Sequence, residues 1–365
     1  MLDLLEADRA FVAENEAQIL DLEAQITARQ RWIDLLRDAQ RAAKQRLSSY
    51  KYPVLTLPNE ILGEIFMHFL PPYPDPPPLV GNLSPICLTH VCRRWRDVAC
   101  KMPSLWRAIE LHPSVHRLSN LGETLSLIAK WSARSGHSPL SIRMECRRQF
   151  DPISIFTSLI PHRARWEHLN LNFGSGSYIQ TLDIDRPMPL LRSLTLTVWD
   201  AVGTPLPLLE VPLLRTVVIN DQGSPSLVLP WSQLTSLTLR RTHPGACLSI
   251  LREASQLLEC RLHLWSQRTP LGGGAVVLPR LESLVFERDS EVCREFFESL
   301  VTPALRRLEL PEAFLRPHDV ETLKAYISKS GCTLQSLRVT ALASLIQQIL
   351  YRMAFRSIPT ITFCE

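Results

Sequence analysis

His112 and His116 have the spacing of a helical metal site, but the residues around them do not suit that chemistry. Paired zinc ligands on a metalloprotease helix are separated by three residues, as these histidines are. No glutamate lies between them, and Pro113 would interrupt the helix that has to bring both rings to one side. We therefore expect no metal site at this position.

The glycines, serines and cysteines of the chain likewise lack the neighbouring residues that a phosphate-binding loop or a catalytic site requires. Gly272, Gly273 and Gly274 neither follow a strand nor open a helix, as a phosphate-binding loop does, so they are interpreted as a turn between repeats. The sequence has no Gly-x-Ser-x-Gly phrase, and its nine cysteines include no Cys-x-x-Cys pair and no nucleophile signature. The sequence thus predicts no catalytic residues, no cofactor and no enzymatic activity.

Charge and hydropathy argue against nucleic acids and membranes as partners. Lys and Arg total 40 against 36 Asp and Glu, and the two signs are mixed along most of the chain. The basic residues Arg93, Arg94 and Arg96 are interpreted as the solvated side of a helix, because Trp95 faces inward. No apolar run approaches the roughly 20 residues that cross a bilayer, and acid replaces the base that a secretory signal needs. With irregularly spaced cysteines, these features favour the cytoplasm or the nucleus.

The most informative spacing is that of apolar residues in two helical patterns. The first reads Leu-Pro-Asn-Glu-Ile-Leu-Gly-Glu-Ile-Phe over residues 57–66, with proline in a first helical turn and an apolar stripe after it. The second follows Ser84-Pro85 and reads Leu-Thr-His-Val-Cys-Arg-Arg-Trp-Arg-Asp-Val-Ala over residues 88–99. About 50 residues of helix hairpin are too few for an independent core, so a partner or an adjoining domain should complete it.

A proline-rich segment over residues 71–78 separates the two helical patterns. Its composition forbids a helix and favours an extended polyproline loop. We interpret it as an insertion that connects the helices, and the alternative is a ligand for an SH3 or WW domain.

These two patterns, followed by Pro-Ser-Leu-Trp at residues 103–106, resemble the F-box family. The opening, central and closing phrases occur in the family's order, and with the proline insertion the chain is most similar to F-box proteins of mushroom-forming fungi. The resemblance implies a three-helix domain that binds a Skp-type adaptor and, through it, a cullin. It also implies a set of adaptor-binding positions, which are Leu57, Pro58, Ile61, Leu62, Ile65, Leu88, Val91, Cys92, Trp95, Leu105 and Trp106.

The 47 N-terminal residues predict a long helix, because they contain no Gly or Pro. Apolar residues recur every seven residues from Leu5 to Ile33, although Asp8, Asn15 and Arg29 interrupt the d positions of this heptad pattern. A coiled coil that self-associates through residues 1–47 is one interpretation, and a helix that packs on its own chain is the other. Acidic residues come early and basic residues late, which would favour an antiparallel partner.

A short phrase of the form Leu-x-x-Leu-x-Leu, with other apolar residues allowed, returns at intervals of 20–29 residues. This interval is typical of leucine-rich repeats, in which each unit adds one strand to a parallel sheet. The phrases begin at Trp166, Leu191, Leu214, Leu234, Leu257, Leu281, Leu305, Leu334 and Ile358. We expect their apolar residues to form the core and alternate residues to form an exposed face. On this face a target protein would meet Arg261, His263, Arg307, Glu309 and Arg338.

The sequence as a whole predicts an α/β repeat protein with three domains. Residues 1–49 form a long helix, residues 50–112 an F-box domain, and residues 113–365 a solenoid of irregular leucine-rich repeats with a parallel sheet. The predicted function is that of the substrate-recognition subunit of a Skp-cullin-F-box ubiquitin ligase, with an unknown protein as its target. The alternative is a scaffold without a ligase role that uses the repeats and the coiled coil.

Overall fold

The structure is a computed structural model that describes residues 2–49, 53–111, 121–146, 152–173, 187–198, 206–207, 210–221, 227–265, 274–287, 294–316, 318–341 and 345–364. The chain divides into two compact units, Met1–Ile61 and Leu62–Glu365. Helix α2 (Asn59–Phe69) begins in the first unit and ends in the second. The predicted domain boundaries after residues 49 and 112 stay predictions.

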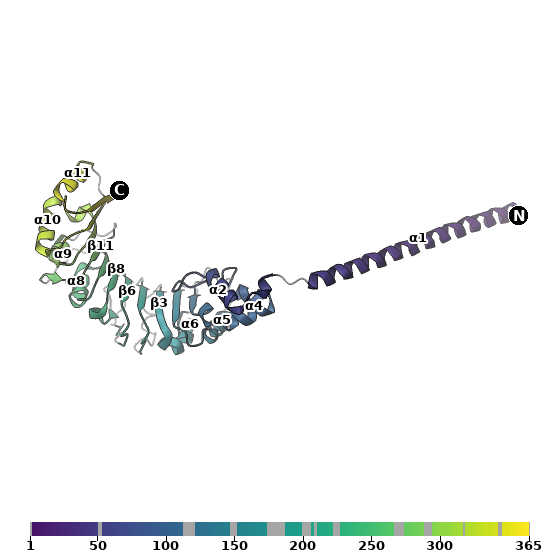
Figure 1. The fold of residues 1–365 in the computed structure, drawn as a ribbon, viewed down its shortest axis with the longest axis horizontal. Helices are drawn as coiled ribbons and strands as arrows, with labels where there is room; N and C mark the ends of the chain where they lie inside the picture. Colours follow the sequence, from purple (N-terminus) through teal and green to yellow (C-terminus); the bar gives the residue numbers. More distant parts are fainter. Residues whose placement is uncertain are drawn as a thin grey trace. The chain divides into compact units, whose positions relative to one another are not determined.

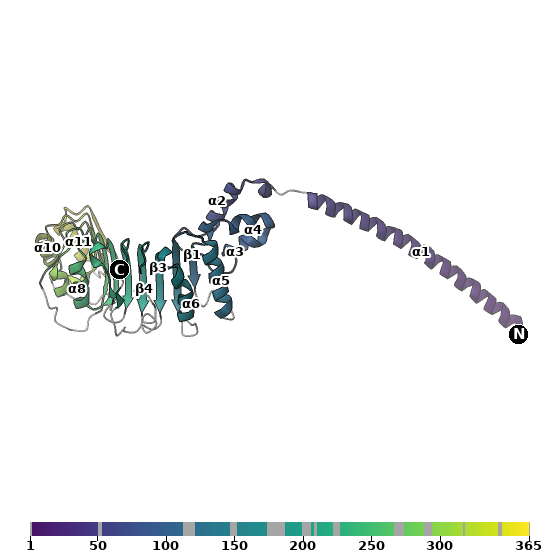
Figure 2. The same cartoon turned by 90° about the horizontal axis from the view of Figure 1, so that it is seen from below.

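The first unit consists mainly of one helix, α1 (Leu2–Ser49), which is followed by the short 3-10 helix η1 (Pro53–Thr56) (Figures 1 and 2). At 1.5 Å per residue, α1 is about 72 Å long. From Leu5 onward its side chains are exposed, apart from half-buried Asn15 and Ala43. The prediction of a long N-terminal helix is confirmed, and its pairing in a coiled coil stays a prediction.

In the second unit, the described residues form one parallel sheet of eleven strands that lie side by side (Figure 2). Each of the nine predicted phrases contributes one strand, so the predicted parallel α/β fold is confirmed. In spatial order the strands are β1 (Ala108–Leu111), β2 (Leu140–Cys146), β3 (Trp166–Phe173), β4 (Ser193–Val198), β6 (Thr216–Asp221), β8 (Ser236–Thr242), β9 (Glu259–Leu264), β11 (Ser283–Phe286), β13 (Arg307–Pro311), β14 (Ser336–Thr340) and β15 (Thr360–Cys364).

Helices, turns and very short strands return the chain from one strand of the sheet to the next. In Figure 1 the later helices lie on the outer side of the curved sheet. The helical elements are α3 (Ile86–Val91), α4 (Arg93–Cys100), η2 (Pro103–Leu105), α5 (Leu121–Arg134), α6 (Pro152–Leu159), η3 (Ile160–Arg165), η4 (Trp231–Gln233), α8 (Pro244–Glu253), α9 (Arg294–Ser299), η5 (Glu312–Phe314), α10 (Asp319–Ser330) and α11 (Leu345–Ala354). Two further parallel pairs join β5 (Leu206–Pro207) to β7 (Leu227–Val228) and β10 (Val276–Val277) to β12 (Leu300–Val301).

The core of the second unit is a stack of equivalent apolar residues. Leu169, Leu194, Val217 and Leu237 are register partners on successive strands, and each is at most 2% exposed. Because side chains alternate across a strand, the residues between them point to the other face, which we call the open face. The leucines predicted to be core are therefore core, and the alternate residues are available at the surface.

Two strands were not predicted among the repeats. β1 and β2 precede the first predicted phrase at Trp166, and their buried residues are spaced like those of the phrase, with Ile109 and Leu111 in β1 and Ile142 and Met144 in β2. The leading position is filled by Trp106 before β1, where it is also part of the closing F-box phrase, and by Pro139 before β2. The sheet therefore begins within the last residues of the F-box-like motif.

Burial controls the reactivity of the cysteines in this core. The thiol of Cys260 is 2% exposed, and desolvation raises its pKa to about 12. We expect iodoacetamide at pH 8 to leave Cys260 unmodified in the native chain and to modify it after unfolding, whereas half-buried Cys87 should react in both states. Peptide mass mapping measures this, and equal native labelling of both cysteines would contradict the burial of Cys260. The thiol of Cys260 loses its proton at a lower pH in the unfolded chain than in the folded chain, because burial raises the folded pKa. The free energy of unfolding therefore falls as pH rises from about 9 towards 12.

Candidate functional site

Helix α2 presents one apolar side to the interior and leaves another at the surface. Leu62 and Phe66 are fully buried, and Gly63 is buried so close to Met102 that a Cβ atom there would lie 3.0 Å from the Cε atom of Met102. Ile61 and Ile65 are 47% and 42% exposed, and their spacing of four residues puts them on the same face of the helix. α2 thus carries more apolar surface than its own chain covers.

The second helical pattern forms two helices instead of the predicted one. The chain is extended at Cys92, with φ of −156°, and this residue ends α3 and caps α4. Its Sγ accepts a hydrogen bond from the backbone N–H of Trp95 at 3.4 Å, which satisfies one of the free donors at the start of α4. Arg96 Nε donates to the carbonyl oxygen of Thr89 at 2.8 Å and ties the two helices together. Val91, the last residue of α3, is 60% exposed.

Trp106 closes the motif from inside the second unit. Its side chain is fully buried, its Nε1 donates to the carbonyl oxygen of Ala99 at 2.8 Å, and its ring packs edge-on against Trp131 with centroids 5.3 Å apart. Phe66 of α2 and Trp95 of α4 form a second ring contact at 5.0 Å. These contacts join α2 and α4 to the first return helix of the sheet, α5.

Burial divides the eleven predicted adaptor-binding residues into three groups. Buried residues contribute to the core of the chain, and these are Leu62, Leu88, Leu105 and Trp106. Half-buried residues offer part of their surface, and these are Leu57, Cys92 and Trp95. Exposed residues are accessible to a partner, and these are Pro58, Ile61, Ile65 and Val91. Contact with an adaptor stays a prediction for each, and the exposed group has the surface for it.

The proline-rich segment lies on the open face of the first strands. Tyr73 Oη donates to Glu167 Oε2 of β3 at 2.8 Å, and Ser141 Oγ of β2 donates to the carbonyl oxygen of Pro74 at 2.6 Å. Asp75 accepts from Arg143 at 2.8 Å. Further along, Pro78 forms a parallel β-bridge with Glu110 of β1. The segment is a connector, as predicted, and it fastens the helical motif to the sheet.

Tyr73 is the centre of this attachment. The guanidinium carbon of Arg107 lies 3.8 Å from the centroid of its ring, and the ring of His168 packs edge-on at 5.4 Å. Burial is the main cause that raises the pKa of Tyr73 well above its ordinary value, and the hydrogen bond to Glu167 and the charge of that carboxylate add to it. The phenol therefore stays protonated and donates its hydrogen bond at every physiological pH.

Replacing Tyr73 with phenylalanine should lower the free energy of unfolding by about 1 kcal/mol, because a half-buried hydrogen bond to a carboxylate is lost. Urea unfolding of the full chain measures this loss. A double-mutant cycle with Glu167→Ala, which removes the acceptor, provides the control, and the two substitutions should be coupled by a similar amount. Strict additivity would show that the bond contributes nothing to the attachment.

The five residues predicted to meet a target lie on the open face, on β9, β13 and β14. Glu309 and Arg338 are register partners and form an ion pair at 3.7 Å, and Nη2 of Arg338 also lies 3.1 Å from Cys364 Sγ. His263 lies 3.9 Å from Glu287. Arg261 and Arg307 are exposed, and neither side chain has an ion pair among the described residues. These two arginines are the ones whose charge is most available to a ligand.

One groove crosses the open face at the N-terminal ends of four strands, β8, β9, β11 and β13, and reaches β14. Its volume is about 470 Å³. Backbone bonds repeat along it, since the carbonyl oxygens of Thr235 and Leu258 each accept two N–H groups from the start of the next strand. The groove is lined by Thr235, Ser236, Leu258, Glu259, Glu282, Ser283, Arg306, Arg307, Gln335 and Ser336. It is a polar channel of mixed charge that includes the predicted residue Arg307.

Helix α11 carries an apolar surface that the sequence analysis did not identify. Ile346, Ile349, Leu350 and Met353 are 71%, 57%, 50% and 59% exposed. They lie opposite buried Tyr351, at the spacing of one helical face. The sequence of α11 contains a second apolar stripe, which could have indicated this surface. The exposed positions of α10, such as Glu321 and Lys324, are by contrast mostly polar.

The described residues show no grouping of three His, Cys, Asp or Glu side chains that could hold a metal ion. His112, His116, Gly272 and Gly273 lie outside the described residues. Among the helices that the structure describes, none combines the length and the apolar composition that a membrane crossing requires.

The comparison with known protein families identifies the motif built from α2, α3, α4 and η2. Residues 54–112 match a family model described as F-box-like. No curated protein matches the chain. F-box domains in general bind Skp-type adaptors, and proteins that carry them are typically non-catalytic subunits of larger complexes. The chain therefore contains an F-box-like domain over residues 54–112, and this domain ends where the parallel sheet begins.

Proposed function

We propose that this chain is the substrate-recognition subunit of a Skp-cullin-F-box ubiquitin ligase. The F-box-like domain would bind the adaptor, and the open face of the sheet, interpreted as leucine-rich repeats, would bind a target protein. The observation that carries this proposal is the attachment of residues 71–78 to β1, β2 and β3. Because of it, the helices after Ile61 and the open face belong to one compact unit.

The mechanism that follows is proximity. A ligase subunit without catalytic residues accelerates transfer by holding the lysines of its target near the ubiquitin carried by another subunit. A rigid connection between the adaptor side and the target side limits the space that those lysines explore. The contacts of Tyr73, Pro74 and Asp75 with the sheet supply such a connection. We place the chain in the cytoplasm or the nucleus, where such ligases work.

On the adaptor side, exposed aliphatic residues support the proposal. Ile65 and Val91 are 42% and 60% exposed, and Ile61 lies on the same side of α2 as Ile65. Large aliphatic side chains that become fully buried in a complex contribute most of its binding energy. The buried members of the motif hold these residues in place.

On the target side, the groove and the exposed side chains of Arg261 and Arg307 support a protein ligand. Arg261 and Arg307 lie on β9 and β13, and Glu259 and Glu282 line the same groove as Arg307. Charges of both signs in one open channel suit an extended polar segment of a protein, which offers backbone groups and side chains of both signs. We therefore expect target binding to weaken as salt concentration rises.

A second candidate function is that of a scaffold without a ligase role, and α11 is the observation that favours it. Four apolar residues of this helix are at least half exposed, which is typical of a surface that binds another protein. A scaffold would use this surface, the open face and α1 without needing the adaptor.

Complex formation with a Skp-type adaptor distinguishes the ligase subunit from the scaffold. The purified full chain and the adaptor should elute as a one-to-one complex in size-exclusion chromatography with light scattering. The chain recovered from cells should bring the adaptor and a cullin with it. Recovery of other partners without any adaptor, from a chain that is folded, would overturn the ligase proposal and favour the scaffold.

A further inference from the structure

Helix α1 exposes an apolar seam, which the polar residues Asp8, Asn15, Arg29 and Gln40 interrupt. With Leu5 at position a of a heptad, the a positions hold Val12, Ile19, Ile26 and Ile33, which are 41–66% exposed. Leu22 and Leu36 occupy d positions and are 56% and 54% exposed. A helix of this length gains most of its stability from covering such a seam with another helix. The first unit itself provides no such cover, because its described side chains on α1 remain exposed.

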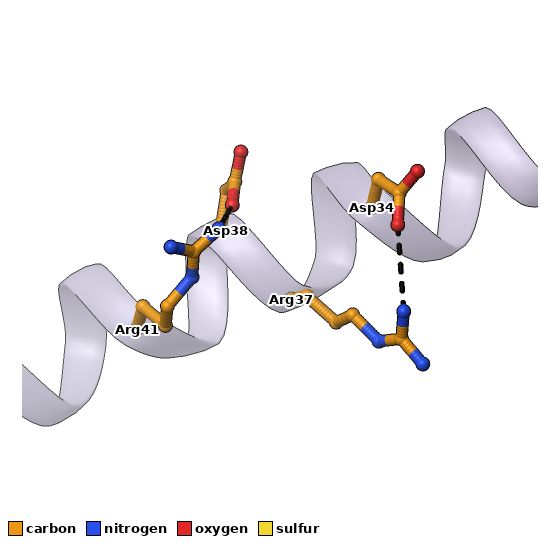
Figure 3. Close-up of polar contacts among 4 residues, drawn as sticks. All are labelled: Asp34, Arg37, Asp38 and Arg41. Atoms are coloured by element: carbon orange, nitrogen blue, oxygen red, sulfur yellow. Dashed lines mark hydrogen bonds and ion pairs between the residues drawn. The ribbon is translucent and has the colours of Figure 1, made fainter.

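The two halves of α1 carry opposite charge. Residues 2–24 contain seven acidic and one basic residue, for a net charge of −6, and residues 25–49 contain six basic and two acidic residues, for a net charge of +4. Both acids of the second half are paired within the helix, Asp34 with Arg37 at 3.5 Å and Asp38 with Arg41 (Figure 3). The first half has no basic residue other than Arg9. A partner helix of the same length should therefore place basic residues beside residues 2–24 and acidic residues beside residues 25–49 of α1.

We propose that α1 forms an antiparallel two-stranded coiled coil with α1 of a second copy of this chain. Antiparallel pairing places the acidic half of each helix beside the basic half of the other. A parallel pair would place acid beside acid and base beside base. The second copy thus supplies both the apolar seam and the charge pattern that α1 requires.

Two polar residues within the seam, Asn15 and Gln40, set the register of this pair, in which Arg29 faces Ile26 and Asp8 faces Leu47 of the partner. When Asn15 at a d position faces Gln40 at an a position of the partner, two amides meet in one layer and can bond to each other. The same register places Ile19 opposite Leu36 and Leu22 opposite Ile33, so the neighbouring layers are apolar. Glu16 and Lys44 both occupy e positions beside the seam and approach each other between the two copies.

The orientation can be tested with the native sequence. Carbodiimide joins a carboxylate directly to an amine, and α1 contains Lys44 as its only lysine. Within one straight helix, Glu16 and Lys44 are about 42 Å apart, so a bond between them requires a second helix running in the opposite direction. We expect peptide mapping of the cross-linked full chain to find Glu16 joined to Lys44. A dimer in which this bond does not form would overturn the antiparallel pairing.

Two adjacent residues provide a matched pair of variants for the association itself. Ile19 lies in the seam, and Leu20 lies outside it at position b, with 54% and 67% exposure. In analytical ultracentrifugation the native full chain should be a dimer at micromolar concentration. Ile19→Asp should raise the dissociation constant of the dimer by about 100-fold, and Leu20→Asp should change it by less than about threefold.

A monomeric native chain, or equal effects of the two variants, would overturn the proposal. Both variants introduce the same residue at neighbouring positions, so any general loss of helix affects them alike. Both should keep native binding to a Skp-type adaptor, since residues 54–112 are unchanged. Failure of self-association is thereby distinguished from failure of the ligase function.

Discussion

Replacing Trp106 with alanine is expected to lower the free energy of unfolding of the second unit by about 3–5 kcal/mol. The side chain is fully buried, and three contacts disappear with it: the ring contact with Trp131 at 5.3 Å, the hydrogen bond to Ala99, and the guanidinium of Arg134 at 4.4 Å from the ring. Such a loss is a large part of the stability of an ordinary domain. Urea unfolding of the full chain, followed by circular dichroism, measures it.

Two further variants test the cause of this effect. Trp106→Phe keeps part of the ring but loses the indole N–H, so a loss of about 1–2 kcal/mol is expected. Trp265 is 44% exposed, and its replacement by alanine should cost about 1 kcal/mol or less. If Trp106→Ala were no more harmful than Trp265→Ala, Trp106 would not be the residue that joins the F-box-like domain to the sheet.

The position of Trp106 explains which part of the fold the sequence could predict. A fixed interval between apolar phrases predicts strands reliably, because each strand must bury the same face against its neighbours. All nine phrases from Trp166 onward are strands of the sheet. β1 escaped prediction because Trp106 was already assigned to the closing phrase of the F-box motif, and β2 escaped it because Pro139 stands at the leading position.

Local capping is a second feature that periodicity could not predict. The apolar spacing of residues 88–99 fits one continuous helix, yet Cys92 adopts an extended conformation and starts a new one. The apolar pattern fits one continuous helix and two shorter helices equally well. In a continuous helix Val91 would lie on the buried stripe, whereas in the structure it is 60% exposed. The break therefore changes Val91 from a core residue into a surface residue.

The sequence predicted which residues belong to the candidate site, but not which of them are buried and which are exposed. A short helix that packs on the core with one side and binds a partner with another has apolar residues on both sides. The apolar pattern of α2 therefore could not show that Leu62 is buried and Ile65 is exposed. The attachment of residues 71–78 depends on Tyr73 meeting Glu167, which are 94 residues apart. Contacts at that separation carry no local signal, and sequence reasoning therefore gave the segment only the role of a connector.

Simultaneous replacement of Ile65 and Val91 with aspartate is expected to weaken binding to a Skp-type adaptor by about 30- to 1,000-fold, which corresponds to ~2–4 kcal/mol. Both side chains are apolar and accessible, with 42% and 60% of their surface exposed. In the proposed complex each would be covered by the partner, and an aspartate there would be buried without a counter-charge. Titration calorimetry with the purified adaptor measures the change.

The choice of exposed residues makes this prediction sharper than one based on the whole motif. Leu62→Asp would also abolish binding, but Leu62 is fully buried, and a charge there would unfold the helices whether or not an adaptor exists. Ile65→Asp with Val91→Asp should leave the unfolding transition within about 1 kcal/mol of the native chain. Ile346→Asp is the matched control, because Ile346 is 71% exposed on α11 and should not affect the adaptor. Unchanged affinity of the folded double variant would show that the adaptor binds a different surface.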